Sequence, residues 1–190
     1  AYNESPTIID NVKCLLSLTY PKFEVIIIND GSTDDTMEKM IKVFDLVKVP
    51  FFYQEHMETA PVRGHYKSKN AVYSKLLVVD KENRESKADA SNAGINSSQH
   101  PLYLCTDVDC ILKADTLVKL VKPFIENKTK VIATGAPIRS SNSCEIKEGF
   151  LDKVHFPKHW YPMFQELEYI RAFLFGRMAW SQLNSLILVS

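Results

Sequence analysis

The sequence predicts an α/β domain, in which strands alternate with helices around a mixed, mostly parallel sheet. Short runs of β-branched residues, such as VIIIND at 25–30, end in polar turn residues, which is typical of buried strands. Several of these runs are followed by segments with apolar residues at helical spacing. A length of 190 residues, with 45% hydrophobic and 24% charged residues, fits one globular domain.

The first half of the chain contains four of the predicted strands and two helices. Residues 23–30 predict a strand buried on both faces, and GSTDDT then supplies turn and cap residues for a helix over about 34–47. PFFYQE at 50–55 predicts a short strand. Residues 64–83 predict two short strands around a Lys-Ser-Lys-Asn turn, the second within KLLVVDK. The small residues of KADASNAGINS predict a helix over 87–97.

The second half continues the alternation. HPLYLCTDVD at 100–109 predicts another buried strand, which is followed by a helix over about 115–125 and a strand over 130–138. An amphipathic helix is expected over 164–178. We expect its apolar stripe to pack in the core, and the alternative is a surface for a membrane interface or a further domain.

Charge and cysteine content exclude some classes of function. Lys+Arg and Asp+Glu balance at 23 each, so we expect no nucleic-acid partner. The four cysteines show no CxxC spacing, which argues against a thiolate metal site and favours a reduced, cytosolic setting. No run reaches the roughly 18 to 20 apolar residues that a membrane-spanning helix needs.

Acidic residues follow three of the predicted strands. Asp30 ends VIIIND, Asp89 lies just past VVDKEN, and the pair Asp107 and Asp109 follows LYLCT. Ligands of open α/β sheets bind at the carboxyl ends of the strands, so we expect these groups to gather at one rim together with Lys87. Two carboxylates one residue apart on a strand point the same way, and they persist cheaply only in water or with a cation or hydrogen-bond donors between them. Acids and a lysine at one rim suit a divalent metal that is bound by oxygen ligands and bridges a diphosphate.

Five stretches occur together in an order typical of one enzyme family. They are AYNES, VIIINDGSTDDT, KENRESKADASNAGIN, LYLCTDVDCIL and QELEYIRAFLFGRMAWSQLN. In these stretches the chain resembles glycosyltransferase family 2, and especially its membrane-associated branch of hyaluronan, chitin, cellulose and poly-N-acetylglucosamine synthases. The resemblance implies the GT-A (Rossmann-like) nucleotide-diphospho-sugar transferase fold. It also implies an inverting transfer of a sugar from a UDP-sugar, first of all UDP-N-acetylglucosamine, to a sugar or glycan acceptor with the help of a divalent metal, Mg²⁺ or Mn²⁺.

The same resemblance implies roles for residues at the nucleoside end of the site. Tyr2 and Glu4 match positions that line the nucleoside pocket. Asp30 matches the acid that holds the base or the ribose, and Asp89 matches a position near the uridine.

At the diphosphate, Lys87 matches a residue that faces the phosphates. Asp107 and Asp109 match the family's DxD pair, in which the second acid ligates the metal and the first contacts the sugar or ribose. A metal and a lysine neutralise the charge that develops on a departing diphosphate.

The resemblance also raises expectations about the whole protein. We expect one GT-A domain that is truncated at both ends, with a nucleotide-binding part at about 1–110 and an incomplete acceptor-side part at about 111–190. The catalytic base is expected beyond Ser190, so the fragment is expected to be inactive. The full-length protein is expected to be embedded in the inner or plasma membrane, with this domain in the cytoplasm.

Two alternatives stay open. A nucleotidyltransferase of similar fold would use a similar acidic rim, although the chain lacks the Gly-rich phosphate loop usual in that class. A non-catalytic nucleotide-binding module would carry the acids as structural caps. Three histidines, His65, His155 and His159, are expected in surface or loop roles rather than as the base.

Overall fold

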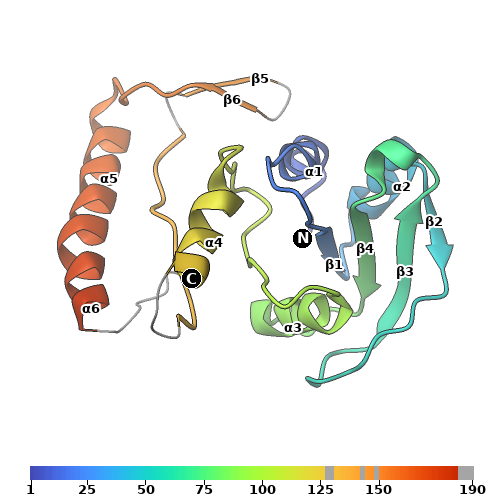
Figure 1. The fold of residues 1–190 in the computed structure, drawn as a ribbon. Helices are drawn as coiled ribbons and strands as arrows, with labels where there is room; N and C mark the ends of the chain where they lie inside the picture. Colours follow the sequence, from blue (N-terminus) through green and yellow to red (C-terminus); the bar gives the residue numbers. More distant parts are fainter. Residues whose placement is uncertain (127–130, 142–143, 148–149, 184–190) are drawn as a thin grey trace. The chain divides into compact units, whose positions relative to one another are not determined.

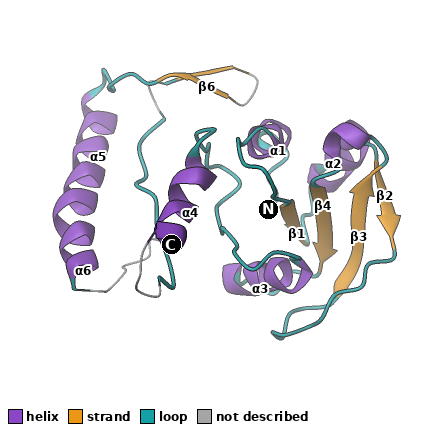
Figure 2. Ribbon diagram, viewed as in Figure 1, coloured by secondary structure: helices purple, strands orange, loops and turns teal. Residues whose placement is uncertain are grey.

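The computed structural model describes residues 1–126, 131–141, 144–147 and 150–183. These residues fall into two compact units, the first made of residues 1–17 and 21–112 and the second of residues 18–20 and the described residues from 113 onwards. The first unit contains a mixed four-stranded sheet with helices on both faces (Figures 1 and 2), which confirms the predicted α/β class.

The strands of this sheet lie in the order β1–β4–β3–β2. Their bounds are Val25–Asp30 for β1, Leu46–Val49 for β2, Val62–Ser68 for β3 and Leu76–Lys81 for β4. The central pair β1 and β4 is parallel, whereas β3 runs antiparallel to both β4 and β2. The strand predicted over 23–30 and the pair predicted within 64–83 are therefore confirmed.

Different helices cover the two faces of the sheet (Figure 2). α1 (Ile8–Leu16) and α2 (Thr36–Phe44) share one buried apolar cluster with alternate residues of β1 and β4. α3 (Lys87–Ser97) lies against the opposite face, where Gly94 faces the side chain of Ile28. Because side chains alternate along a strand, the last two residues of β1 point to opposite faces of the sheet, and the same is true of β4. The helix predicted over 87–97 is confirmed, whereas α1 was not anticipated.

α2 is shorter than the helix expected over 34–47. It ends at Phe44 because Asp45 adopts a left-handed conformation, with φ of 49°. Aspartate tolerates this conformation better than most residues, since its short polar side chain can hydrogen-bond locally. The chain then enters β2, which was not anticipated and which begins inside the range expected for the helix.

The strand predicted over 50–55 is wrong. Pro50 has no backbone N–H to contribute to a ladder, and Phe52 is 95% exposed. The chain that follows is fixed to α3 instead of to a strand. Oδ1 of Asn96 accepts hydrogen bonds from the backbone N–H groups of His56 and Met57, both at 3.1 Å.

The strands predicted over 100–109 and 130–138 are also wrong. Residues 100–109 form no ladder with the other described strands, and Tyr103 is 62% exposed. Residues 131–138 are likewise irregular, with Ile132 86% exposed, and residue 130 lies outside the described ranges. Apolar composition alone does not make a strand, because the backbone groups also need a neighbouring strand to bond with.

The second unit is mainly helical. α4 (Thr116–Glu126) confirms the helix expected over 115–125. A short antiparallel hairpin of β5 (Glu145–Lys147) and β6 (Phe150–Lys153) was not anticipated. The helix expected over 164–178 is part of a longer helical segment, composed of α5 (Trp160–Arg171), the π-helical turn η2 (Ala172–Arg177) and α6 (Met178–Gln182).

The apolar stripe of that segment is not packed into a core, which corrects the first interpretation. Phe164, Leu174 and Phe175 are all more than half exposed. The polar Glu166 is the buried residue of α5, and it accepts hydrogen bonds from Nε of Arg139 at 2.6 Å and from the backbone N–H of Ser140 at 2.8 Å. None of the described helices is both long and apolar enough to cross a membrane.

His65 is buried in β3, so its expected surface role is wrong. Its ring stacks on Phe51, lies against Tyr53, and bonds through Nε2 to the hydroxyl of Ser97 at 3.2 Å. Burial lowers the pKa of His65 because the low-dielectric surroundings disfavour the imidazolium.

Phe44→Ala tests the apolar cluster under α1 and α2. Phe44 is fully buried and meets Tyr73 edge-to-face, with ring centroids 5.0 Å apart. We expect the free energy of unfolding, measured by urea titration, to fall by about 3–5 kcal/mol through lost burial and an unfilled cavity. The control Val43→Ala, at a side chain 41% exposed on the same helix, should stay within about 0.5 kcal/mol of the unmodified chain. Equal losses in the two variants would contradict this core.

His65 should also make stability depend on pH. Its pKa is lower in the folded chain than in the unfolded one, so the unfolded state binds the proton first as the pH falls below about 6.5. Stability is thus retained above that pH and declines towards acid, with a slope of at most about 1.4 kcal/mol per pH unit from this group.

Urea titrations of the chain and of His65→Gln between pH 8 and 5 measure this contribution. The variant should be less stable at pH 8 but should lose less on acidification. His56→Gln, at an exposed histidine, should keep the acid sensitivity of the unmodified chain. An unchanged slope in His65→Gln would rule out the assignment.

Candidate functional site

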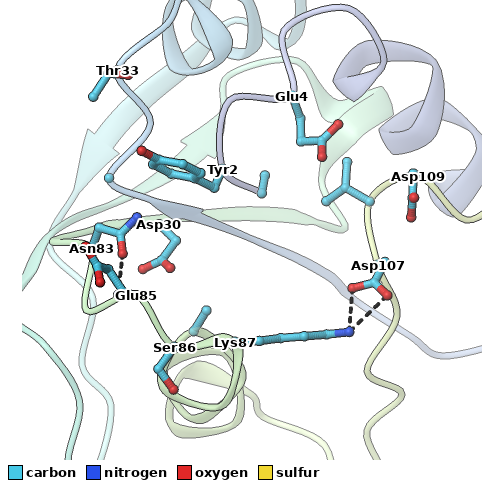
Figure 3. Close-up of a pocket in the computed structure, with 14 residues that line it drawn as sticks. Tyr2, Glu4, Asp30, Thr33, Asn83, Glu85, Ser86, Lys87, Asp107 and Asp109 are labelled. Atoms are coloured by element: carbon cyan, nitrogen blue, oxygen red, sulfur yellow. Dashed lines mark hydrogen bonds and ion pairs between the residues drawn. The ribbon is translucent and has the colours of Figure 1, made fainter. Parts of the chain in front are cut away.

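A cavity of about 820 Å³ opens in the first unit at the carboxyl ends of β1 and β4 (Figure 3). Four segments that are distant in the sequence contribute to its wall. The lining residues are Ala1, Tyr2, Glu4, Asp30, Gly31, Thr33, Asn83, Glu85, Ser86, Lys87, Ala90, Asp107, Val108 and Asp109. The cavity therefore lies at the rim where the sequence predicts a ligand.

The end of β1 requires glycine at the first position after the strand. Gly31 has a φ of +67°, and a Cβ added there would lie 2.8 Å from the backbone nitrogen of Asn83. Only glycine combines this conformation with so close a backbone approach. The close approach brings the loop after β4 beside Asp30, at the floor of the cavity.

The segment that carries Tyr2 and Glu4 is fixed to β1 by backbone hydrogen bonds. The nitrogen of Ala1 donates to the carbonyl of Ile28 at 2.7 Å, and the N–H of Asp30 donates to the carbonyl of Ala1 at 2.9 Å. The nitrogen of Glu4 also donates to the hydroxyl of Thr36 at 3.0 Å. These bonds hold the Tyr2 ring beside the cavity, where Figure 3 shows it near Asp30.

The loop between β4 and α3 forms another wall. Oδ1 of Asn83 accepts a hydrogen bond from the N–H of Glu85, which itself has a positive φ of 53°. Ser86 then caps α3 by accepting a hydrogen bond from the N–H of Asp89. Since Ser86 and Lys87 both line the cavity, the N-terminus of α3 faces it and contributes a positive end of the helix dipole.

Lys87 reaches across the cavity to Asp107 (Figure 3). Its ammonium lies 2.7 Å from Oδ1 and 2.9 Å from Oδ2 of that carboxylate. The hydrogen bond to Asp107 raises the pKa of Lys87 above its usual value, so the side chain stays charged at neutral pH. Both partners are more than half exposed, so this pair is open to exchange with a ligand.

Asp107 and Asp109 lie on a turn rather than on a strand, and both face the cavity. The turn is closed by a hydrogen bond from the N–H of Cys110 to the carbonyl of Asp107 at 3.2 Å. The intervening Val108 packs against the apolar cluster of the first unit. The expectation that the two acids share one side therefore holds, although the predicted strand alternation is not its cause.

The donor atoms at this turn fit a hard divalent cation. One ligand atom from each of Asp107, Asp109 and Cys110 can be chosen so that all three lie within 4.8 Å of one another. Burial raises the pKa of Cys110, which keeps the thiol protonated and leaves the two carboxylates as the better ligands. Carboxylate oxygens are the ligands that Mg²⁺ and Mn²⁺ prefer.

The charge of the lining also favours a cation. Five carboxylates and one lysine ammonium face the cavity: Glu4, Asp30, Glu85, Asp107, Asp109 and Lys87. A phosphate would be repelled by this excess of negative charge unless a cation entered with it.

Asp89 differs from the other expected site residues because it does not line the cavity. Its buried carboxylate lies 2.6 Å from Nζ of Lys81 and accepts a hydrogen bond from the N–H of Ala60 at 2.9 Å. Burial opposes ionisation of Asp89, but the contacts with Lys81 and Ala60 outweigh it and lower the pKa of the carboxyl. The same ammonium lies 2.5 Å from Oδ1 of Asp30.

The structure thus brings six of the seven expected residues to one cavity, namely Tyr2, Glu4, Asp30, Lys87, Asp107 and Asp109. Lys81 was predicted only as the last residue of a strand and not as a residue near the site. One signal was available: a lysine that ends an apolar strand such as KLLVVDK must find a buried acid. The loop residues Asn83 and Glu85 gave no local signal, because their position depends on how the loop folds.

The sequence also matches a known family model. The model described as "Glycosyl transferase family 2" matches residues 1–53 and 65–175, which include all the expected site residues.

Curated relatives carry the same name in two species. The chain is 32% identical over 143 residues to the poly-beta-1,6-N-acetyl-D-glucosamine synthases of Staphylococcus epidermidis and of Staphylococcus aureus strain COL. The aligned part covers 75% of this chain but only 28% of each relative, so the chain spans less than a third of their length. No solved structure matches the chain.

Asp109→Asn tests the candidate metal ligands directly. Removing one of two anionic oxygen donors should weaken Mn²⁺ binding roughly tenfold or more, as measured by the loss of free-Mn²⁺ signal in electron paramagnetic resonance. The control Asp10→Asn, at an exposed acid on α1, should bind Mn²⁺ like the unmodified chain. Equal Mn²⁺ affinity in all three proteins would exclude Asp109 as a ligand.

Proposed function

Because the chain belongs to glycosyltransferase family 2, we propose that its first unit binds the nucleotide-diphospho-sugar donor of a glycosyl transfer. The donor is a UDP-sugar, and the acceptor is a sugar or a glycan. The observation that supports this most directly is the single cavity that unites a lysine, a helix N-terminus and five carboxylates. Such a lining suits a pyrophosphate that arrives with a divalent cation.

The nucleoside occupies the end of the cavity between Tyr2 and Asp30. The aromatic ring of Tyr2 offers a face for a base. The carboxylate of Asp30 is acceptor-only when ionised, so it suits an N–H of the base or a hydroxyl of the ribose. Glu4 lines the same cavity from the segment that holds Tyr2.

The diphosphate occupies the end near Lys87 and Asp107. Lys87 stands on the first turn of α3, so its ammonium and the helix N-terminus attract the phosphates together. Asp107 and Asp109 are the residues that would hold Mg²⁺ or Mn²⁺. When bound, the cation neutralises charge on the leaving diphosphate.

The reaction is a displacement with inversion at the anomeric carbon of the donor. The acceptor oxygen forms a bond to that carbon, the bond to the diphosphate oxygen breaks, and its electron pair leaves with UDP. Lys87 stabilises the negative charge that develops on UDP. A base must take the proton of the acceptor hydroxyl, and we assign no residue of this chain to that role.

The donor sugar and the cellular setting are further parts of this proposal. The two staphylococcal proteins are named as synthases of a polymer of N-acetylglucosamine, which supports UDP-N-acetylglucosamine as the donor. We propose that the whole protein is embedded in the inner or plasma membrane and presents this domain to the cytoplasm, where nucleotide-sugars are made.

Calorimetry with UDP tests the proposal. UDP should bind, and Mn²⁺ should tighten its binding. Asp30→Asn should weaken UDP roughly tenfold both with Mn²⁺ and in EDTA, since it removes a charged hydrogen-bond acceptor at the nucleoside. Asp109→Asn should match the unmodified chain in EDTA and weaken UDP when Mn²⁺ is present.

Asp10→Asn again serves as the control. Selective binding of nucleoside triphosphates over UDP would favour a nucleotidyltransferase instead. Failure of the unmodified chain to bind UDP at any metal concentration would contradict the proposed function.

A further inference from the structure

We propose that Lys81 is a positioning residue for the nucleoside end of the cavity. Its buried ammonium holds one oxygen of the Asp30 carboxylate and leaves the other oxygen free to accept a hydrogen bond from the ligand. This inference rests on the nucleotide-binding function proposed above and deepens it, because it names the residue that orients the acceptor.

Strand register brings the two side chains together. Asp30 and Lys81 are paired residues at the ends of the parallel strands β1 and β4. Paired residues in neighbouring strands project to the same face of a sheet, here the face covered by α3. The preceding pair, Asn29 and Asp80, projects to the other face, where Nδ2 of Asn29 donates to Oδ1 of Asp80 at 2.7 Å. A shift of one residue in the register would exchange the two pairs.

The ammonium of Lys81 has no freedom to turn elsewhere. Its side chain is 0% exposed, and three oxygen atoms surround its ammonium. Nζ donates hydrogen bonds to Oδ1 of Asp30 at 2.5 Å and to the carbonyl oxygen of Glu82 at 2.6 Å, and it forms an ion pair with Oδ2 of Asp89 at 2.6 Å. Enclosed by these three oxygens, Lys81 fixes the distance and direction of its bond to Asp30.

Asp89 in turn holds Lys81 from α3. Its other oxygen accepts the hydrogen bond from Ala60, and Arg84 approaches that oxygen to 3.6 Å from outside. The chain from Ala60 through Asp89 and Lys81 to Asp30 is therefore a continuous set of charged and hydrogen-bonded contacts. It connects α3 and the loop before β3 to the cavity floor.

Asp30 is left with one oxygen for a ligand. Its side chain is 11% exposed, and that exposure faces the cavity it lines (Figure 3). Across the described part of the chain, Oδ2 of Asp30 accepts no hydrogen bond, whereas Oδ1 is bonded to Lys81.

The double variant Lys81→Met/Asp89→Asn tests the proposal while keeping the net charge of the triad. The probe is uridine, which has no phosphate, and its affinity is measured by NMR titration at pH 8.0. We expect roughly tenfold weaker binding, because the acceptor is no longer oriented. When the same two changes are made together with Asp30→Asn, they should weaken uridine binding by less than about twofold beyond Asp30→Asn alone, because the oxygen that Lys81 orients is then already altered.

The comparison isolates Asp30 because its other charged surroundings are unchanged. These are the amino group of Ala1 and the side chains of Glu4, Glu85, Lys87, Asp107 and Asp109. Arg84→Gln is the matched control: it removes a cation that contacts Asp89 but not Asp30, and it should leave uridine affinity within about twofold. Should the double variant not fold, Lys81→Gln alone replaces it, and its effect on uridine affinity should likewise disappear when Asp30→Asn is also present.

The outcomes separate the two proposals. Binding of uridine by the variant with the affinity of the unmodified chain would overturn the role of Lys81 and leave the proposed function standing. A loss of affinity that is equally large with and without the Asp30→Asn change would mean that Lys81 only supports the fold, and it would also overturn the inference. If the unmodified chain binds neither uridine nor UDP, the proposed function fails and this inference fails with it.

Discussion

The parallel pairing of β1 with β4 is the constraint on which the cavity depends. Because the two strands run the same way, their last residues emerge side by side, and the loops that follow them form opposite walls of one pocket. The pairing also determines which polar residues meet under that pocket, since Asp30 lies opposite Lys81 and both turn towards α3. The apolar cluster on the other face keeps the register in place through α1 and α2.

Two kinds of charge balance coexist at this rim. Below the cavity floor, the buried ammonium of Lys81 is enclosed by Asp30, Asp89 and the carbonyl oxygen of Glu82. In the open cavity, Lys87 and Asp107 form an exposed pair beside further carboxylates. The buried group is suited to holding geometry, because breaking a desolvated pair is costly. The exposed pair is suited to exchange, because water already solvates both partners.

The sequence predicted those features that depend on local patterns. The sequence pattern predicted β1 from its β-branched run and α3 from its small residues. The polar residues at the ends of both elements then indicated where the ligand-binding rim of the sheet lies. Residues 100–109 have the composition of a strand, but they pair with none of the described strands. Strand pairing depends on which segments the tertiary fold brings together, so composition alone did not predict it. α2 ends earlier than predicted because Asp45 adopts a left-handed backbone conformation. The tendency of aspartate to adopt this conformation is too weak to predict a helix end from the sequence. Lys81 was missed because its partners are distant in sequence, although the register of β1 and β4 brings them together.

The contact between Lys87 and Asp107 has a thermodynamic consequence. An anion that recruits the ammonium of Lys87 deprives Asp107 of its counter-ion, and a cation that binds Asp107 releases the ammonium of Lys87. Each event thereby lowers the free-energy cost of the other, which is the signature of reciprocal linkage between two ligands. A single ion must therefore break the Lys87–Asp107 pair at a cost in free energy, whereas an anion and a cation that bind together give each residue a new partner of opposite charge.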